Sequence, residues 1–149
     1  MRKIIYTTPN GNFCVVHPVR NTHPVPETLS DAEVEARAFA KLPADAINPQ
    51  FVEADQIPAD RSFRNAWKAG SGKVEHDMAK CREIHKDRLR EQRKDALAAL
   101  DVAYMRADEA GNTQLKAQIA AQKQALRDIT SDPRIANATT PEELKQVTL

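Results

Sequence analysis

The sequence has few of the features that mark secreted, membrane-spanning or catalytic proteins. Its two cysteines, Cys14 and Cys81, lie far apart, and the first residues form too short an apolar run for a secretion signal, so we expect free thiols in an intracellular protein. No stretch approaches the roughly 18 apolar residues of a membrane helix. Gly70 and Gly72 are not part of a phosphate-binding-loop motif. The sequence also shows no nucleophilic side chain with a base and an orienting group placed to activate it. The sequence therefore predicts neither an enzyme nor a cofactor site.

Aromatic residues are also scarce, whereas charge is abundant and unevenly distributed. Trp, Tyr and Phe make up 5% of the 149 residues, and charged residues 29%, which is an ordinary soluble composition. The net charge is only +1, but residues 61–94 carry 11 basic and 5 acidic side chains, against 5 and 8 in residues 1–60 and 6 and 8 in residues 95–149. This basic island can attract an acidic protein, a membrane surface or nucleic acid, although the balanced total argues against a dedicated nucleic-acid binder.

The front of the chain predicts a β-hairpin followed by a loop. Residues 3–6 and 13–17 are apolar, β-branched runs, and Asn10 and Gly11 between them suit a tight turn. Prolines then interrupt the chain as far as residue 26, which indicates a loop because proline lacks an amide donor and disfavours helix at the preceding residue.

A helix and a third strand complete the expected N-terminal lobe. Ser30 and Glu33 have the capping-box spacing and predict a helix over about residues 31–41. Residues 51–54 are a short strand candidate. A three-stranded sheet with one helix against it is the natural α+β solution for residues 1–56.

Residues 57–67 hold the only tryptophan and join the strand-rich front to a helix-rich back. After a proline turn, Phe63, Ala66 and Trp67 fall at the spacing of one face of a short helix. We expect residues 57–76 to connect the two parts, with Phe63 and Trp67 as an aromatic plug that seats the long helix which follows against the sheet.

Residues 77–149 predict a long antiparallel helical hairpin and a short terminal helix. No Pro or Gly occurs from residue 78 until Gly111, and a second helix is expected over about residues 113–128. Thr140 and Glu143 predict a last helix over about residues 141–146. Apolar residues at heptad spacing should pack the two long helices together. The expected core comprises Phe63, Trp67, Leu97, Leu100, Tyr104, Ile119 and Leu126.

The amino half of the first long helix has no partner in this scheme. The second helix reaches roughly 24 Å, about half the length of the first. Residues 82–95 carry a basic row beside an acidic row, with Glu83–Lys86 and Asp87–Arg90 three apart, close enough for helical ion pairs. We expect this uncovered, amphipathic half to bind a partner or a second copy. The candidate partner-binding residues are Arg82, Lys86, Leu89, Arg90, Arg93 and Lys94.

Three other groups of residues have both a functional and a structural interpretation. Cys14, His17, Cys81 and His85 are zinc-type ligands, but nothing in their spacing makes them converge, and a strand-edge histidine with a buried thiol is the alternative. The histidines at positions 17, 23 and 76 are conceivable acid–base groups or plain surface residues. The basic residues around Trp67 could grip phosphates while Phe63 and Trp67 stack on bases, or the aromatics are core. These basic residues are Arg61, Arg64, Lys68, Lys73 and Lys80.

Several segments carry a resemblance to a known family. Residues 57–67 and 77–85 resemble small proteins of tailed bacteriophages and prophages. Residues 93–128, with Leu97-Ala-Ala-Leu-Asp101, Tyr104-Met-Arg-Ala107 and Gln122-Lys-Gln-Ala-Leu-Arg-Asp-Ile129, resemble the helical hairpin of phage tail assembly chaperones and tail-fibre assembly proteins.

The resemblance implies protein binding without chemistry. A protein of this kind holds a tail or tail-fibre protein in the host cytoplasm until assembly, or stays in the virion as a minor structural piece. The uncovered half of the first long helix also allows a homo-oligomer. The alternative is a phage accessory protein that binds nucleic acid or a host-defence factor through the basic island. The resemblance implies no cofactor, metal or membrane.

Overall fold

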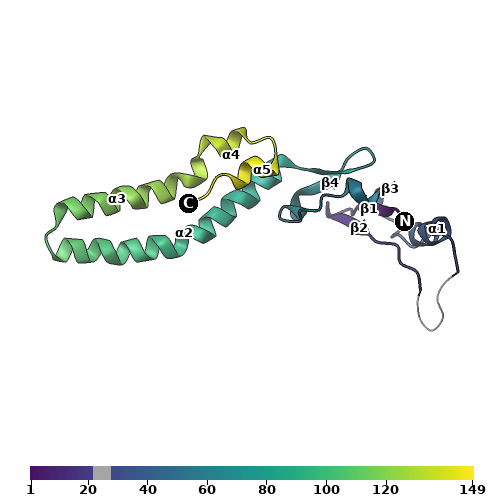
Figure 1. Cartoon of the computed structure of the whole chain (residues 1–149), viewed down its shortest axis with the longest axis horizontal. Helices are drawn as coiled ribbons and strands as arrows, with labels where there is room; N and C mark the ends of the chain where they lie inside the picture. The colour runs from purple at the N-terminus through teal and green to yellow at the C-terminus, as the bar shows by residue number, and fades with distance from the viewer. Residues whose placement is uncertain (22–27) are drawn as a thin grey trace. The chain divides into compact units, whose positions relative to one another are not determined.

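The computed structural model describes residues 1–21 and 28–149, which form two compact units, Met1–Asp77 and Met78–Leu149 (Figure 1). The fold class is α+β, as the sequence predicts, with a small antiparallel sheet in the first unit and long helices in the second. Residues 57–76 are part of the first unit rather than a separate connection. The loop residues 22–27, including His23, lie outside the described residues.

The main sheet of the first unit has the strand order β2-β1-β3, and all its neighbours are antiparallel. The predicted hairpin is β1 (Lys3–Thr7) and β2 (Phe13–Val16). Gly11, in the turn between them, has a φ of 79°, which glycine adopts without strain. β3 (Ile47–Val52) begins earlier than predicted, and its Pro49 is tolerated because β3 is an outer strand.

Helix α1 (Asp31–Ala40) covers one face of this sheet. The predicted capping box is confirmed, since the Ser30 side chain accepts from the Glu33 amide and the Glu33 carboxylate accepts from the Ser30 amide. The rings of Phe39 on α1 and Phe51 on β3 have centroids 5.0 Å apart. Val34 is buried on the same helix.

A second, two-stranded sheet packs on the opposite face. β4 (Trp67–Ala69) pairs antiparallel with β5 (Val74–His76), and Trp67 lies in one core cluster with Ile5, Val52 and Val74. The prediction that Phe63 and Trp67 are core residues is confirmed. The predicted short helix is wrong: Arg64–Ala66 forms a single 3₁₀ turn (η2), after which Trp67 enters a strand. Another 3₁₀ turn, η1, spans Ala54–Gln56.

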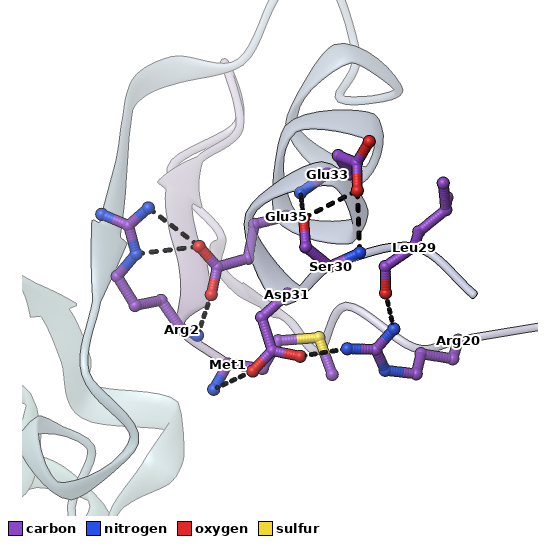
Figure 2. A network of polar contacts seen from close by, with 8 residues as sticks. All are labelled: Met1, Arg2, Arg20, Leu29, Ser30, Asp31, Glu33 and Glu35. Carbon is purple, nitrogen blue, oxygen red and sulfur yellow. Dashed lines mark hydrogen bonds and ion pairs between the residues drawn. The ribbon is translucent and has the colours of Figure 1, made fainter. Parts of the chain in front are cut away.

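A polar network ties the start of β1 to α1 (Figure 2). The Glu35 carboxylate, only 4% exposed, accepts hydrogen bonds from the Arg2 backbone N–H and, at 2.9 Å, from Arg2 Nε. These donors hold the pKa of Glu35 below its usual value, and the Arg2 backbone N–H has the largest effect. Nearby, Arg20 bonds both Asp31 and the Leu29 carbonyl oxygen.

We expect Glu35→Gln to destabilise the first unit by about 1–2 kcal/mol at neutral pH, because an amide nitrogen would face the Arg2 donors. The carboxylate contributes stability above the unfolded-state pKa near 4.5, and this contribution is lost as the pH falls through the lower folded-state pKa. The difference between variant and parent should therefore close in acid. Urea unfolding followed by Trp67 fluorescence at pH 7 and at about pH 3 measures it. Glu53→Gln, at an exposed site, is the control, and an equal loss there would contradict the account.

The second unit contains the predicted antiparallel hairpin of α2 (Met78–Glu109) and α3 (Thr113–Asp128), which lie side by side in Figure 1. Gly111, with a φ of 65°, makes the turn. The Asn112 side chain caps α3 by accepting from the Leu115 amide at 3.0 Å. Two ion pairs of 2.5 Å join the helices, and they are Asp101–Lys123 and Asp108–Lys116.

The expected hairpin core is only partly buried. Ile119 is buried, as predicted, whereas Leu97, Leu100, Tyr104 and Leu126 are half-buried. The reason is that two helices cover only one side of each other's apolar stripe.

Three short elements follow the hairpin. A 3₁₀ turn, η3 (Ile129–Ser131), leads to α4 (Pro133–Asn137), which the sequence analysis missed. The predicted last helix is α5 (Pro141–Lys145), and its capping box between Thr140 and Glu143 is confirmed. None of the helices in residues 1–21 and 28–149 has the length and apolarity of a membrane span.

Candidate partner-binding surface

The amino half of α2 is covered on one face by the last residues of the chain. Leu89 on α2 is 1% exposed, and Leu144 on α5 and Val147 are fully buried. Arg82 Nη2 donates to the Ala138 carbonyl oxygen at 2.9 Å. The expectation that this half of α2 is uncovered is therefore wrong for this face. The physical reason is that the apolar side chains of α4 and α5 are removed from water by packing against α2.

His85 belongs to the same covered face. Its Nε2 lies 3.0 Å from the Val147 carbonyl oxygen, and its side chain is buried with Cys81 one turn earlier. Burial lowers the pKa of His85, because a charged imidazole loses solvation there, while the Val147 carbonyl acts in the opposite direction. Cys81 and His85 are thus placed as packing residues within the second unit.

A second face of α2 carries the ion-paired rows that the sequence predicts. Lys86 pairs with Glu83 at 3.0 Å and Arg90 with Asp87 at 2.6 Å, so both predicted pairs are confirmed. Lys94 pairs with Glu91 at 2.5 Å. On this surface Lys86, Arg90 and Lys94 are therefore each balanced by an acidic residue three positions earlier.

Arg93 has a structural task inside the hairpin. Its Nη1 donates to the carbonyl oxygens of Leu126 at 3.1 Å and Arg127 at 2.7 Å. These carbonyls belong to the last turn of α3, which has no further helical donors. Of the six candidate residues, Arg82, Leu89 and Arg93 contribute to the unit itself, and Lys86, Arg90 and Lys94 remain on its surface.

An apolar groove lies on the α2–α3 hairpin beside the end of the chain. Its volume is about 400 Å³. Leu149, which forms part of it, is 50% exposed, and Ala125 on α3 is exposed. We call it the hairpin groove, and its residues are Leu100, Gln122, Ala125, Leu126, Ile129 and Leu149. Two of these residues, Leu100 and Leu126, belong to the core that the sequence predicts for the hairpin.

Comparisons of the chain with protein-family models, with curated proteins and with solved structures found no match.

The zinc-type ligands are divided between the units. Cys14 and His17 belong to the first unit, and Cys81 and His85 to the second. Among residues 1–21 and 28–149, no three His, Cys, Asp or Glu side chains are grouped closely enough to hold a metal ion. Both cysteines are free thiols.

Trp67 and His76 face each other across the β4–β5 hairpin. The Trp67 indole N–H donates to His76 Nε2 at 3.1 Å, and the tryptophan is 7% exposed. An indole buried in this way has no free face for a nucleic-acid base, so the core interpretation of Trp67 is confirmed. The basic residues proposed to surround it, including Arg61, Arg64 and Lys68, are exposed.

Proposed function

We propose that the protein acts without catalysis in the assembly of phage tails or tail fibres, by holding an apolar segment of a tail or tail-fibre protein in the hairpin groove. The observation that carries the proposal is this groove of about 400 Å³, formed mainly by aliphatic side chains of Leu100, Leu126 and Ile129. A groove between two helices is a common seat for the apolar face of an amphipathic helix. The resemblance of residues 93–128 to phage tail assembly proteins supplies the class of partner.

The size of the groove favours a short segment over a second copy of the chain. Stable interfaces between folded proteins use about 20–30 residues on each side. The hairpin groove has six lining residues, which suits a few large apolar side chains from one segment. Binding of a second copy of the chain in this groove is the alternative that the test below distinguishes.

The charge-balanced rows on α2 support binding through apolar contact. Lys86, Arg90 and Lys94 are each paired with an acid of the same helix, so these three residues add little net charge to the surface. Binding to the partner should therefore change little with salt. Steep salt dependence and capture of nucleic acid would instead favour the accessory-protein alternative, in which the basic island binds.

The test compares two substitutions on exposed alanines of α3. Ala125 forms part of the hairpin groove, whereas Ala120 does not. We expect Ala125→Glu to reduce co-purification of tail or tail-fibre proteins from particle-producing cells by about tenfold or more, because a carboxylate would be buried without a partner. Ala120→Glu should behave as the parent.

Two further results decide the outcome. If both substitutions leave the co-purifying tail proteins unchanged, or if only a second copy of the chain is lost, the proposal is wrong. Mass spectrometry of purified particles separates the two forms of the function, because a minor virion component remains in the particle and a chaperone leaves it. In the first form the protein is found in the virion, and in the second only in the host cytoplasm.

A further inference from the structure

A second groove, of about 550 Å³, lies entirely within the first unit. One wall is β2, whose residues Phe13 and Val15, with His17 just beyond the strand, occupy alternate positions and so face the same side. The other wall is the segment between η1 and β4, including Ile57 and Arg61. We call it the arginine groove, and its residues are Phe13, Val15, His17, Ile57, Pro58, Ala59, Arg61, Arg64, Asn65 and Trp67.

Two arginines give the arginine groove a positive charge that no ion pair of the described residues neutralises. Arg61 and Arg64 are exposed, and none of the described residues that line the groove is acidic. Within residues 1–21 and 28–149, neither arginine side chain has an ion pair, whereas Arg2, Arg20 and Lys73 of the same unit each have one. Two unpaired guanidinium groups beside an apolar wall are suited to bind carboxylates, which they hold with two parallel hydrogen bonds.

The floor of the groove is apolar and fixed. Phe13, Val15 and Ile57 are partly buried and pack against the core cluster that contains Trp67. Trp67 is held by its own hydrogen bond to His76, so its ring cannot swing out to stack on a base. Single-stranded nucleic acid is usually bound by exposed aromatic rings along a basic track, and this groove has neither an exposed indole nor more than two arginines.

We propose that the arginine groove binds an acidic peptide segment, in which an apolar side chain rests on the wall of Val15 and Ile57 and neighbouring carboxylates pair with Arg61 and Arg64. This site lies in a different unit from the hairpin groove and does not depend on the function proposed for it. It gives the chain a second interaction surface with a partner of the opposite charge.

The test uses the full chain and three sets of short synthetic peptides with a central leucine. In the first set the leucine is flanked by Asp and Glu, in the second by Asn and Gln, and in the third by Lys. Since the chain has one tryptophan, its indole N–H gives a single NMR signal that reports on this groove. We expect the acidic set alone to shift this signal and to bind measurably in fluorescence anisotropy.

The arginines are tested by a matched pair of double variants. R61Q/R64Q should weaken binding of the acidic peptides by about tenfold or more, because hydrogen bonds to charged groups are lost. R106Q/R127Q removes two exposed arginines from the second unit and should have no effect. The spectrum of each variant is first recorded without peptide, and a variant is compared with the parent only if its indole signal lies at the parent position.

Three results would overturn the proposal. They are equal binding of the acidic and neutral peptides, equal loss of binding in the two double variants, and tighter binding of oligothymidine than of the acidic peptides. The last result would assign the groove to nucleic acid.

Discussion

Leu144→Ala is expected to lower the free energy of unfolding of the second unit by about 2–5 kcal/mol, the usual cost of a buried Leu→Ala substitution. Leu144 is fully buried on α5, the helix that contacts the amino half of α2. The substitution leaves a cavity under the covered face, where Leu89 and Ile135 are also buried. A loss of this size is a large fraction of the stability of a small unit.

The measurement is urea unfolding followed by circular dichroism at the helical band, which reports mainly on the helices of the second unit. Leu115→Ala is the matched control, because Leu115 is 42% exposed on α3 and should cost less than about 1 kcal/mol. If the two substitutions cost the same, the last helix does not cover α2 in the way described.

Ile5→Ala should have a comparable effect on the first unit, again about 2–5 kcal/mol. Ile5 lies on the central strand β1, is fully buried, and shares a cluster with Val52, Trp67 and Val74. The cavity would therefore open between the two sheets. Trp67 fluorescence during urea unfolding measures the loss at the site where it arises.

The matched control for Ile5→Ala is Ile47→Ala. Ile47 is 45% exposed at the start of β3, so its truncation removes little buried surface. We expect a change below about 1 kcal/mol, and also an emission maximum that stays at the parent position. An equal loss in both variants would show that the two sheets do not share the described core.

Local signals in the sequence predicted the helices α1, α2, α3 and α5 and their approximate ends. The capping residues Ser30 and Thr140 act within one turn of the helix that they start. The residues that fix the start of each helix are therefore adjacent in the sequence and can be recognised there. The same is true of the turn at Gly111, which separates α2 from α3. The bounds of α3, Thr113–Asp128, agree with the prediction for this reason.

The β4–β5 hairpin was missed because its strands are three residues long and are defined by each other. Phe63, Ala66 and Trp67 have helical spacing, but Trp67 pairs with His76 across the strands. Gln50 of β3 braces the turn, since its Nε2 donates to the Gly70 carbonyl oxygen at 2.9 Å. Contacts between residues this far apart leave no periodic pattern in a single sequence.

The sequence predicted the ion pairs of the candidate site but not its grooves or its covered face, for a similar reason. The ion pairs on α2 join residues three apart, and the sequence indicated them directly. The burial of Leu89 depends on Leu144, more than fifty positions later, and the hairpin groove depends on Leu149 reaching α2 and α3. The apolar spacing of Leu144 and Val147 was the available signal that the last helix needs a partner.

The most direct test of the proposed function is photo-cross-linking from the hairpin groove. A benzophenone amino acid is placed at Ala125 in one variant and at Ala120 in another, and each is irradiated in cells that produce phage particles. We expect a covalent adduct with a tail or tail-fibre protein from position 125 and none from position 120. The same adducts from both positions, or adducts from position 125 to a second copy of the chain alone, would contradict the proposal that this groove holds a tail protein.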